Sequence, residues 1–259
     1  MPYTLSHTAI VLPFARLLRR WRVLSATLIG AMVPDFHIFF PWHLPRPETH
    51  RAMALLTFCL PVGLASYWIF EQVVKTPVLE VLPEGAYARS RPFAAPADFA
   101  SVRQWFLAAF AILVGAFTHL VWDAFTHEGA FGVRLIPALD EPIVEFGRHR
   151  MMGVRLLQEG TSLIGLAVVF AFLCYALRRG SLPPIQSRAL RVVERRAWVF
   201  AYIATAVALT ALAYVGARVG EPAVHSLAGA VNPVAVAALR GLAGALLGVS
   251  LLLGLRLRT

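Results

Sequence analysis

The residues best suited to chemistry lie in the segment GAFTHLVWDAFTHEG, at positions 115–129. His119, Asp123 and His127 recur every four residues, so on a helix they share an arc of about 80° on one face. A His and an Asp one turn apart can bind one divalent metal ion, and a third ligand one turn further can extend or bridge the site. The spacing therefore predicts a metal site on one face of a helix.

This segment ends an apolar run, so its polar side chains are expected inside a membrane. His119 would lie about 12 Å below His127 along the helix axis. An ionised carboxylate at that depth costs roughly 2.5–3.5 kcal/mol on the insertion scale. Asp123 therefore needs a neutralising partner, which a metal ion or a buried cation would supply. The alternative is a polar face on which His and Asp side chains bond each other or line a water-filled crevice.

Further candidate ligands are expected at the same membrane face. Asp35 follows Pro34, which favours a helix break that exposes the carboxylate. His7 and His50 lie near the chain start and at the mouth of the first apolar run, although helix capping or turn chemistry would also account for these positions. If five spans form, the candidate ligands that can converge are His7, Asp35, His50, His119, Asp123 and His127.

Arg51 directly follows His50 and is the candidate for substrate binding. A guanidinium group there could hold a phosphate or a carboxylate. An arginine at a membrane edge can equally extend its side chain to the lipid headgroups.

The elements that must position these residues are membrane-spanning helices. Of the 259 residues 58% are hydrophobic and only 15% charged, which excludes a soluble enzyme. We expect an all-α, polytopic transmembrane helix bundle, because five runs approach the roughly 20 apolar residues that a span requires. The expected spans are residues 53–74, 104–126, 161–177, 197–216 and 234–255.

The apolar residues 8–33 are interrupted by Arg16, Arg19, Arg20 and Arg22, which leaves two pieces too short to cross. We expect interfacial or re-entrant helices there, with a sixth span as the alternative.

We divide the chain into a core with the candidate site, residues 1–177, and a basic loop with a helical hairpin, residues 178–259. The formal charge of +10 comes from basic residues that lie mostly between the apolar runs. That placement suits the lipid bilayer and its anionic headgroups and excludes a nucleic-acid surface. The oligomeric state stays open.

Five motifs occur in an order that resembles a bacterial membrane family known as domain of unknown function 4184. They are MPYTLSH, GAMVPDF, THRAMALLTFCLPVGL, GAFTHLVWDAFTHEG and LLQEGTSLIGL, within residues 1–175. The resemblance implies a multi-pass protein of the bacterial inner (cytoplasmic) membrane, and it implies no activity. Gln158, in the last motif, is expected near the site.

The chain is more distantly similar to inner-membrane proteins described as metal-dependent hydrolases. By ligand order alone it also resembles zinc-dependent phospholipase C. Carried over position by position, that order implies as metal ligands His7, Asp35, His50, His119 and Asp123. Two features depart from the phospholipase pattern: His127 follows Asp123 by only four residues, and no later His-x-x-x-Glu occurs.

The leading hypothesis is a metal-dependent hydrolase that acts at the membrane interface on a phosphoester or lipid-like substrate. Its cofactor would be a divalent metal ion of the zinc type, which activates water. Two alternatives remain: a transporter or channel that uses the His/Asp face for protons or ions, and a non-catalytic scaffold whose polar residues only pair helices.

Overall fold

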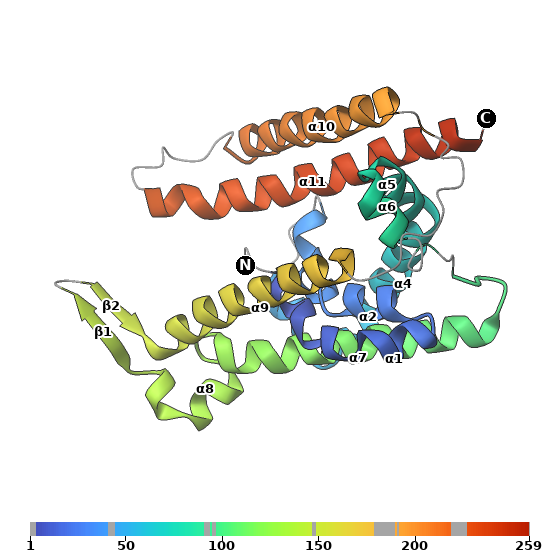
Figure 1. The fold of residues 1–259 in the computed structure, drawn as a ribbon. Coiled ribbons are helices and arrows are strands. Elements are labelled where there is room, and N and C mark those ends of the chain that lie inside the picture. The colour runs from blue at the N-terminus through green and yellow to red at the C-terminus, as the bar shows by residue number, and fades with distance from the viewer. Residues whose placement is uncertain are drawn as a thin grey trace. The chain divides into compact units, whose positions relative to one another are not determined.

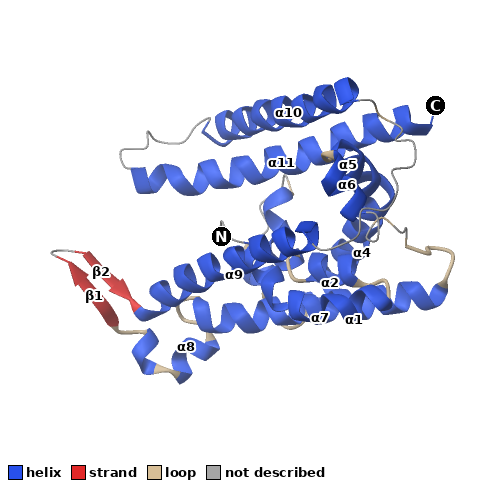
Figure 2. Ribbon diagram, viewed as in Figure 1, coloured by secondary structure: helices blue, strands red, loops and turns tan. Residues whose placement is uncertain are grey.

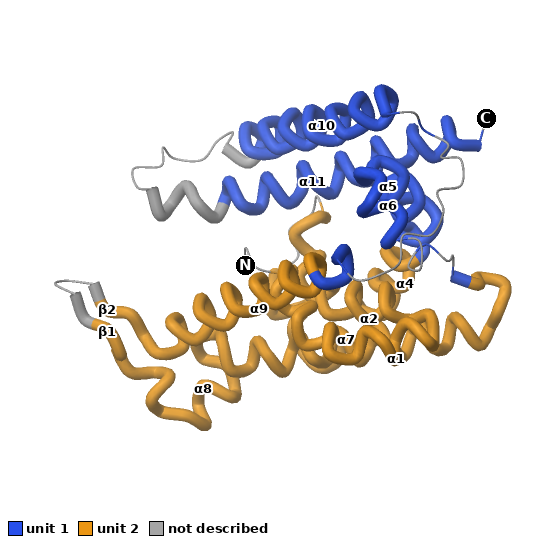
Figure 3. Tube along the Cα trace, viewed as in Figure 1, with its two compact units in different colours: residues 1–2, 68–97, 175–259 blue, residues 3–67, 98–174 orange. Residues whose placement is uncertain are grey.

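The computed structural model describes residues 4–40, 45–90, 94, 97–146, 149–178, 190, 192–218 and 227–258, and almost all of them are helical (Figure 1). The basic loop expected around residues 178–196 lies largely outside the described residues. Two compact units emerge (Figure 3): Tyr3–Tyr67 with Asp98–Cys174, and residues 1–2 with Trp68–Ala97 and Tyr175–Thr259. All the candidate ligands belong to the first of these, which we call the site unit.

Five helices are long and apolar enough to cross a membrane, which confirms the all-α, polytopic architecture. They are Leu55–Val81, Val102–Thr126 (α7), Gly153–Arg178 (α9), Val192–Gly216 and Pro233–Arg258. The last two lie within α10 (Val192–Arg218) and α11 (Leu227–Arg258). The third begins eight residues before the expected position, because the polar stretch with Arg155, Gln158 and Glu159 continues the helix beyond its apolar part.

The first spanning helix, Leu55–Val81, is not uniform along its length. It consists of two α-helical stretches, α4 (Leu60–Ile69) and α5 (Lys75–Val81), each preceded by one π-helical turn. Those turns are η4 (Leu55–Cys59) and η5 (Phe70–Val74).

Short helices fill the N-terminal region, and none of those described is long enough to cross a membrane. They are η1 (Thr4–Ile10), η2 (Leu12–Phe14), α1 (Ala15–Arg20), α2 (Leu24–Gly30) and η3 (Val33–Phe39). Arg22 separates α1 from α2 in a left-handed conformation, with φ of 57°. Gln104 of α7 donates a hydrogen bond to the Arg22 carbonyl at 3.0 Å, so this turn is held against a spanning helix.

A β-hairpin interrupts the otherwise helical chain between α7 and α9 (Figure 2). Strands β1 (Pro142–Phe146) and β2 (His149–Met152) pair antiparallel, with Glu145 opposite Arg150 and an irregularity between Pro142 and Val144. Before it lie α8 (Phe131–Leu135) and η7 (Pro137–Leu139). The remaining short helices are α3 (Arg46–Thr49) and α6 (Glu84–Ser90).

Helix α7 has one face of small buried residues against which α2 packs. Gly30 and Gly115 make the closest approach: a Cβ atom on Gly30 would lie 2.4 Å from the Ile112 carbonyl oxygen, and one on Gly115 would lie 2.3 Å from that of Thr27. Only glycine fits at both positions, because each contact is with backbone that cannot move aside. The opposite face of α7 exposes large apolar side chains, among them Phe106 and Phe110.

In the other unit, α10 and α11 lie side by side and also meet at a small residue (Figure 1). A Cβ atom on Gly241 would lie 2.2 Å from the Thr210 hydroxyl oxygen. The hydroxyl groups of Tyr202 and Ser250 lie 2.8 Å apart across the same pair.

We predict that Gly115→Ala lowers the thermal stability of the detergent-solubilised protein, because the added methyl group overpacks the α2–α7 crossing at a cost of about 1–3 kcal/mol. Gly160→Ala on α9 is the matched control, since a Cβ atom there meets nothing within 4 Å. Its melting temperature should stay unchanged or rise, because alanine favours a helix over glycine. Equal melting temperatures for the two variants would contradict the packing described.

Candidate metal centre

Helix α7 places His119 and Asp123 one turn apart on its buried face. His119 Nδ1 lies 2.8 Å from the carbonyl oxygen of Ala31, the residue that follows α2. An imidazole that donates from Nδ1 to a carbonyl carries its lone pair on Nε2, which is the arrangement that orients metal-binding histidines. The close α2–α7 crossing thus brings Ala31 near enough to direct His119 Nε2 towards Asp123.

Asp35 reaches the same point from the first turn of η3, where Pro34 precedes it. One carboxylate oxygen, Oδ2, accepts a hydrogen bond from the Thr4 hydroxyl at 2.7 Å. The other, Oδ1, lies 3.3 Å from His50 Nε2 and 3.7 Å from His119 Nε2. Thr4 therefore holds the carboxylate so that its second oxygen points at two imidazoles.

His50 ends α3 and is oriented by its own helix. Its Nδ1 atom lies 3.2 Å from the Arg46 carbonyl oxygen and 2.8 Å from the Thr49 hydroxyl. Its Nε2 atom lies 3.3 Å from Asp35 Oδ1 and 3.4 Å from Asp123 Oδ2. Like His119, it presents Nε2 to the carboxylates.

Asp35, His50, His119 and Asp123, which we call the inner set, therefore converge from three segments. Their nitrogen-to-oxygen separations of 3.3–3.7 Å exceed the usual 2.7–3.2 Å of an N–H···O hydrogen bond. Two tetrahedral ligands on zinc, each about 2.0–2.1 Å from the metal, lie about 3.3–3.4 Å apart. These four separations are closer to the spacing of two ligands on one ion than to that of hydrogen-bonded pairs.

Several ligand atoms of this centre are buried without a hydrogen-bond partner among the described residues. They are Asp35 Oδ1, His50 Nε2, His119 Nε2 and Asp123 Oδ1. Two groups of three residues could hold a metal ion, and His119 belongs to both: His7 with His119 and Asp123, and Asp35 with His50 and His119. Buried polar atoms without partners are costly, so their convergence calls for a further group between them.

His7 stacks on His119, with ring centroids 3.8 Å apart, and its Nε2 atom lies 3.7 Å from Asp123 Oδ1. Helix α9 packs closely behind it, since a Cβ atom on Gly165 would lie 2.8 Å from the Ser6 carbonyl oxygen. Burial, and next the neighbouring His119 imidazole, lower the pKa of His7 to about 4. His7 is therefore neutral at pH 7, as a ligand must be.

The pKa of Asp35 is shifted in the direction that keeps it ionised. Burial alone would raise this pKa, but the neighbouring His50 and His119 and the Thr4 hydroxyl outweigh burial and hold it at about 2. At neutral pH the carboxylate is therefore charged and able to bind a cation.

His127 contacts Asp123 from the C-terminal end of α7, with Nδ1 3.4 Å from Asp123 Oδ1. Its Nε2 atom lies 3.2 Å from the Gln158 side-chain amide nitrogen on α9. An amide N–H that donates to Nε2 leaves the ring proton on Nδ1, facing the carboxylate. Gln158 thus lies beside the cluster, as expected from the sequence, and acts on it through His127.

Arg46 is the cationic partner that sequence reasoning missed. Its guanidinium group donates to Asp123 Oδ2. Arg51, the residue expected to bind substrate, pairs with Glu48 at 2.7 Å, and both side chains are exposed. The sequence did hold a signal for Arg46: it stands four residues before His50, one helical turn away, and between two prolines.

A pocket of about 340 Å³, which we call the polar pocket, opens beside the inner set. Its lining includes Arg46, His50, Asp123, His127 and Glu128. It gives the cluster an open side, as the open coordination position of a catalytic metal site requires.

The structure brings all six candidate ligands together: His7, Asp35, His50, His119, Asp123 and His127. His37 follows Asp35 by two residues and lies behind His50: its Nδ1 atom is 3.1 Å from the Pro34 carbonyl oxygen, and its ring meets the His50 ring edge-on with centroids 6.0 Å apart. Burial lowers the pKa of His37.

The model of a family described as a domain of unknown function, DUF4184, matches residues 1–251, and the chain belongs to that family. This confirms the resemblance seen in residues 1–175 and extends it into the C-terminal hairpin. No curated protein and no solved structure matches the chain significantly.

We predict that, in the presence of a chelator, Arg46→Gln destabilises the protein by about 1–3 kcal/mol, because it removes the cation that donates to the buried Asp123 carboxylate. Arg51→Gln should cost at most about 1 kcal/mol, since it removes only an exposed ion pair. Thermal unfolding of both variants beside the wild type is the measurement. A larger loss for Arg51→Gln would contradict the assignment of Arg46.

Proposed function

We propose that this member of the DUF4184 family is a membrane hydrolase that holds a divalent metal ion, zinc by its ligand types, in the inner set. Its substrate would be a phosphoester or lipid-like molecule at the membrane interface. The observation that carries the proposal is the convergence of His50 Nε2, His119 Nε2 and Asp35 Oδ1, which are buried and have no hydrogen-bond partner among the described residues, at separations close to those of metal ligands. Two His and two Asp ligands suit zinc, and manganese is the chemical alternative.

Each ligand has a second contact that would orient it. His119 is held by the Ala31 carbonyl, His50 by the Arg46 carbonyl, and Asp35 by the Thr4 hydroxyl. Such outer contacts are characteristic of metal centres, because they fix the tautomer and the direction of each ligand. Polar residues that merely paired helices would bond one another directly at 2.7–3.2 Å.

His7 and His127 face the other oxygen of Asp123, Oδ1, at 3.7 and 3.4 Å. We assign His7 as a further ligand, because its ring is neutral and its Nε2 atom faces the carboxylate. We assign His127 to holding Asp123 in place, since its Nε2 atom is directed to Gln158.

A transport path is less well supported than a hydrolytic site. The polar atoms gather near the C-terminal end of α7, whereas the buried face of the same helix from Ala108 to Ala116 consists of alanine, isoleucine and glycine. A proton or ion relay needs polar groups along the whole span. The polar residues therefore fit a one-sided site better than a channel.

Hydrolysis of a phosphoester joins a water oxygen to phosphorus, breaks the bond from phosphorus to the leaving oxygen, and transfers a water proton to that oxygen. A divalent ion in the inner set would supply the acidification of water at neutral pH. Arg46, on the wall of the polar pocket, would hold the anionic ester once the ion neutralises Asp123. Glu128, on the same wall, would accept the water proton and return it to the leaving oxygen.

We propose the inner membrane of a bacterium as the location of this multi-pass protein; its five apolar helices and the family resemblance support that proposal. Anionic lipid headgroups are expected contacts of its basic residues.

We predict stoichiometric zinc or manganese in the detergent-purified wild type and loss of that metal from Asp123→Asn and His119→Gln, because each substitution removes a ligand. Elemental mass spectrometry on folded, monodisperse protein is the measurement. His37→Gln is the matched control and should retain the metal, since its Nδ1 atom faces the Pro34 carbonyl oxygen and it belongs to neither group of candidate ligands. A folded wild type without metal, or unchanged metal in Asp123→Asn, would overturn the proposal.

We predict further that Arg46→Gln keeps the metal but hydrolyses bis-para-nitrophenyl phosphate several-fold more slowly than the wild type, because the anionic probe loses its guanidinium partner. Arg51→Gln should hydrolyse the probe at the wild-type rate. Equal rates of probe hydrolysis for the two arginine variants would contradict the assignment of Arg46 to substrate binding.

A further inference from the structure

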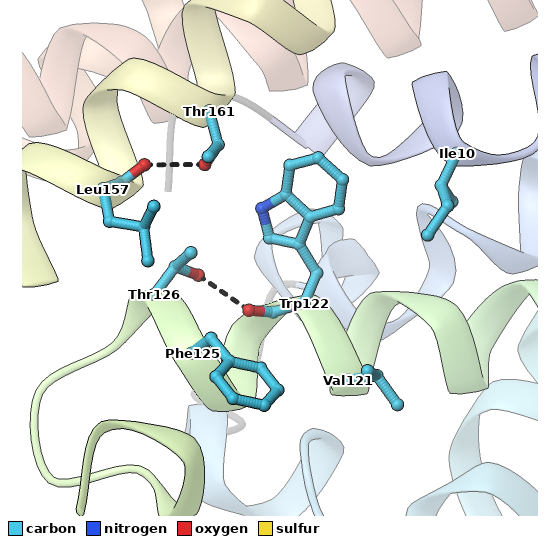
Figure 4. A pocket seen from close by; sticks show the side chains of 7 residues that line it. All are labelled: Ile10, Val121, Trp122, Phe125, Thr126, Leu157 and Thr161. Atoms are coloured by element: carbon cyan, nitrogen blue, oxygen red, sulfur yellow. Dashed lines mark hydrogen bonds between the residues drawn. The ribbon is translucent and has the colours of Figure 1, made fainter. Parts of the chain in front are cut away.

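A second pocket, of about 270 Å³, lies against α7 within the site unit; we call it the apolar pocket (Figure 4). Helix α7 contributes Val121, Trp122, Phe125 and Thr126, and α9 contributes Leu157 and Thr161. The α7 residues at 121, 122, 125 and 126 alternate with those that line the polar pocket, at 120, 123, 124 and 127. At about 100° per residue, the two pockets occupy opposite faces of one helix.

The surface of the apolar pocket is almost entirely apolar, and the polar side-chain groups of its lining are the Trp122 indole N–H and two threonine hydroxyls. Its two threonine hydroxyls are turned back onto their own helices (Figure 4): Thr161 donates to the Leu157 carbonyl at 2.7 Å, and Thr126 donates to the Trp122 carbonyl at 3.1 Å. A polar ligand would lose its hydration there and find at most the Trp122 indole N–H as a partner. A hydrocarbon chain makes no hydrogen bonds to water, so it would pay no such cost on entering the pocket.

The apolar pocket is continuous with the membrane-facing surface. Helices α7 and α9 are both long and apolar enough to cross the bilayer. Val121 and Phe125, on the pocket wall, are 42% and 37% exposed, and the exposed side chains continue along α7 with Phe117 and Val114. Ile10, on the opposite wall, is exposed as well. A lipid chain can therefore enter sideways from the bilayer without crossing water.

Trp122 connects the apolar pocket with the metal centre. Its indole ring occupies the middle of the pocket wall (Figure 4) and meets the His7 ring edge-on, with centroids 5.8 Å apart. His7 in turn faces Asp123. At the end of α7, Thr126 lines the apolar pocket and the next residue, His127, lines the polar one. A ligand that bends around this helix end would have its chain in one pocket and its head in the other.

We propose that the apolar pocket binds one acyl chain of a bilayer lipid, and that the substrate of the metal centre is such a lipid rather than a water-soluble ester. The second half of this proposal rests on the proposed hydrolase function. The first half, binding of the chain, stands independently of any catalysis.

Photolabelling tests the binding site. The full-length protein is placed in nanodiscs of phosphatidylcholine that contain a phosphatidylcholine with a diazirine on one acyl chain, and labelled residues are mapped by mass spectrometry. We expect several-fold more label on Trp122 and Phe125 than on Phe106 and Phe110, which are more exposed residues of the same helix. Equal labelling of these two pairs of residues would overturn the assignment of the pocket as a lipid site. Cross-linking of Val121 to a second copy of the chain would overturn it as well.

Two matched substitutions extend the test. Val121→Trp fills the pocket, whereas Val114→Trp makes the same change two turns away, at a residue of nearly equal exposure. We expect Val121→Trp alone to reduce pocket labelling several-fold while both variants keep wild-type metal content. Unchanged labelling in Val121→Trp would show that the label does not report on this pocket and would overturn the assignment.

Activity separates this inference from the proposed function. We expect Val121→Trp to slow phospholipid hydrolysis several-fold and to leave hydrolysis of bis-para-nitrophenyl phosphate unchanged, whereas Asp123→Asn abolishes both. If the protein hydrolyses the soluble probe but the label is not concentrated on the pocket residues, the lipid-binding site is wrong and the hydrolase function still stands. If the label is concentrated on the pocket residues but the wild type hydrolyses neither substrate, the hydrolase function and the lipid as its substrate are wrong. The lipid-binding site then still stands.

Discussion

The centre depends on one constraint: the Asp123 carboxylate is buried in a membrane-spanning helix and must be neutralised. Its burial costs roughly 2.5–3.5 kcal/mol in the absence of compensation. Arg46 donates to one oxygen, and His50 and His119 face that same oxygen at 3.4 Å. With His7 of η1 at 3.7 Å from the other oxygen, the groups around Asp123 come from η1, from α3 with the following His50, and from α7 itself, so this carboxylate is a common contact of three segments of the site unit.

That packing requires short helices and breaks within the site unit. The backbone departs from regular α-helix in η1 and η3, which carry His7 and Asp35. Irregular backbone at membrane depth is tolerated where protein covers it. The small residues of α7 provide that cover, because Gly115 lets α2 approach until the Ala31 carbonyl reaches His119. The same contact therefore closes the core and directs a ligand.

Helix α7 serves three environments at once. Its buried face carries the cluster, a second face lines the polar pocket, and a third continues into the lipid-facing surface and the apolar pocket. Small residues such as Ala108, Gly115 and Ala116 on the buried face make this possible, since they leave room for neighbouring segments there while large aromatic residues such as Phe106 extend from the other side. A metal-dependent hydrolase drawing its substrate from the bilayer would use all three faces.

The sequence by itself determined the five spanning helices and the shared face of His119, Asp123 and His127, because apolar length and a four-residue period are local properties that a helix translates directly into geometry. It also indicated His7, Asp35 and His50, although their convergence depended on contacts between segments. Only the tertiary structure decided that Arg46 contacts Asp123 while Arg51 pairs with Glu48, and that Ala31 and Thr4 orient the candidate ligands. Every residue has a backbone carbonyl, so the sequence cannot indicate which one orients a histidine. Arg46 and Arg51 are only five residues apart, yet their side chains have different partners. These partners therefore follow from how the segments pack.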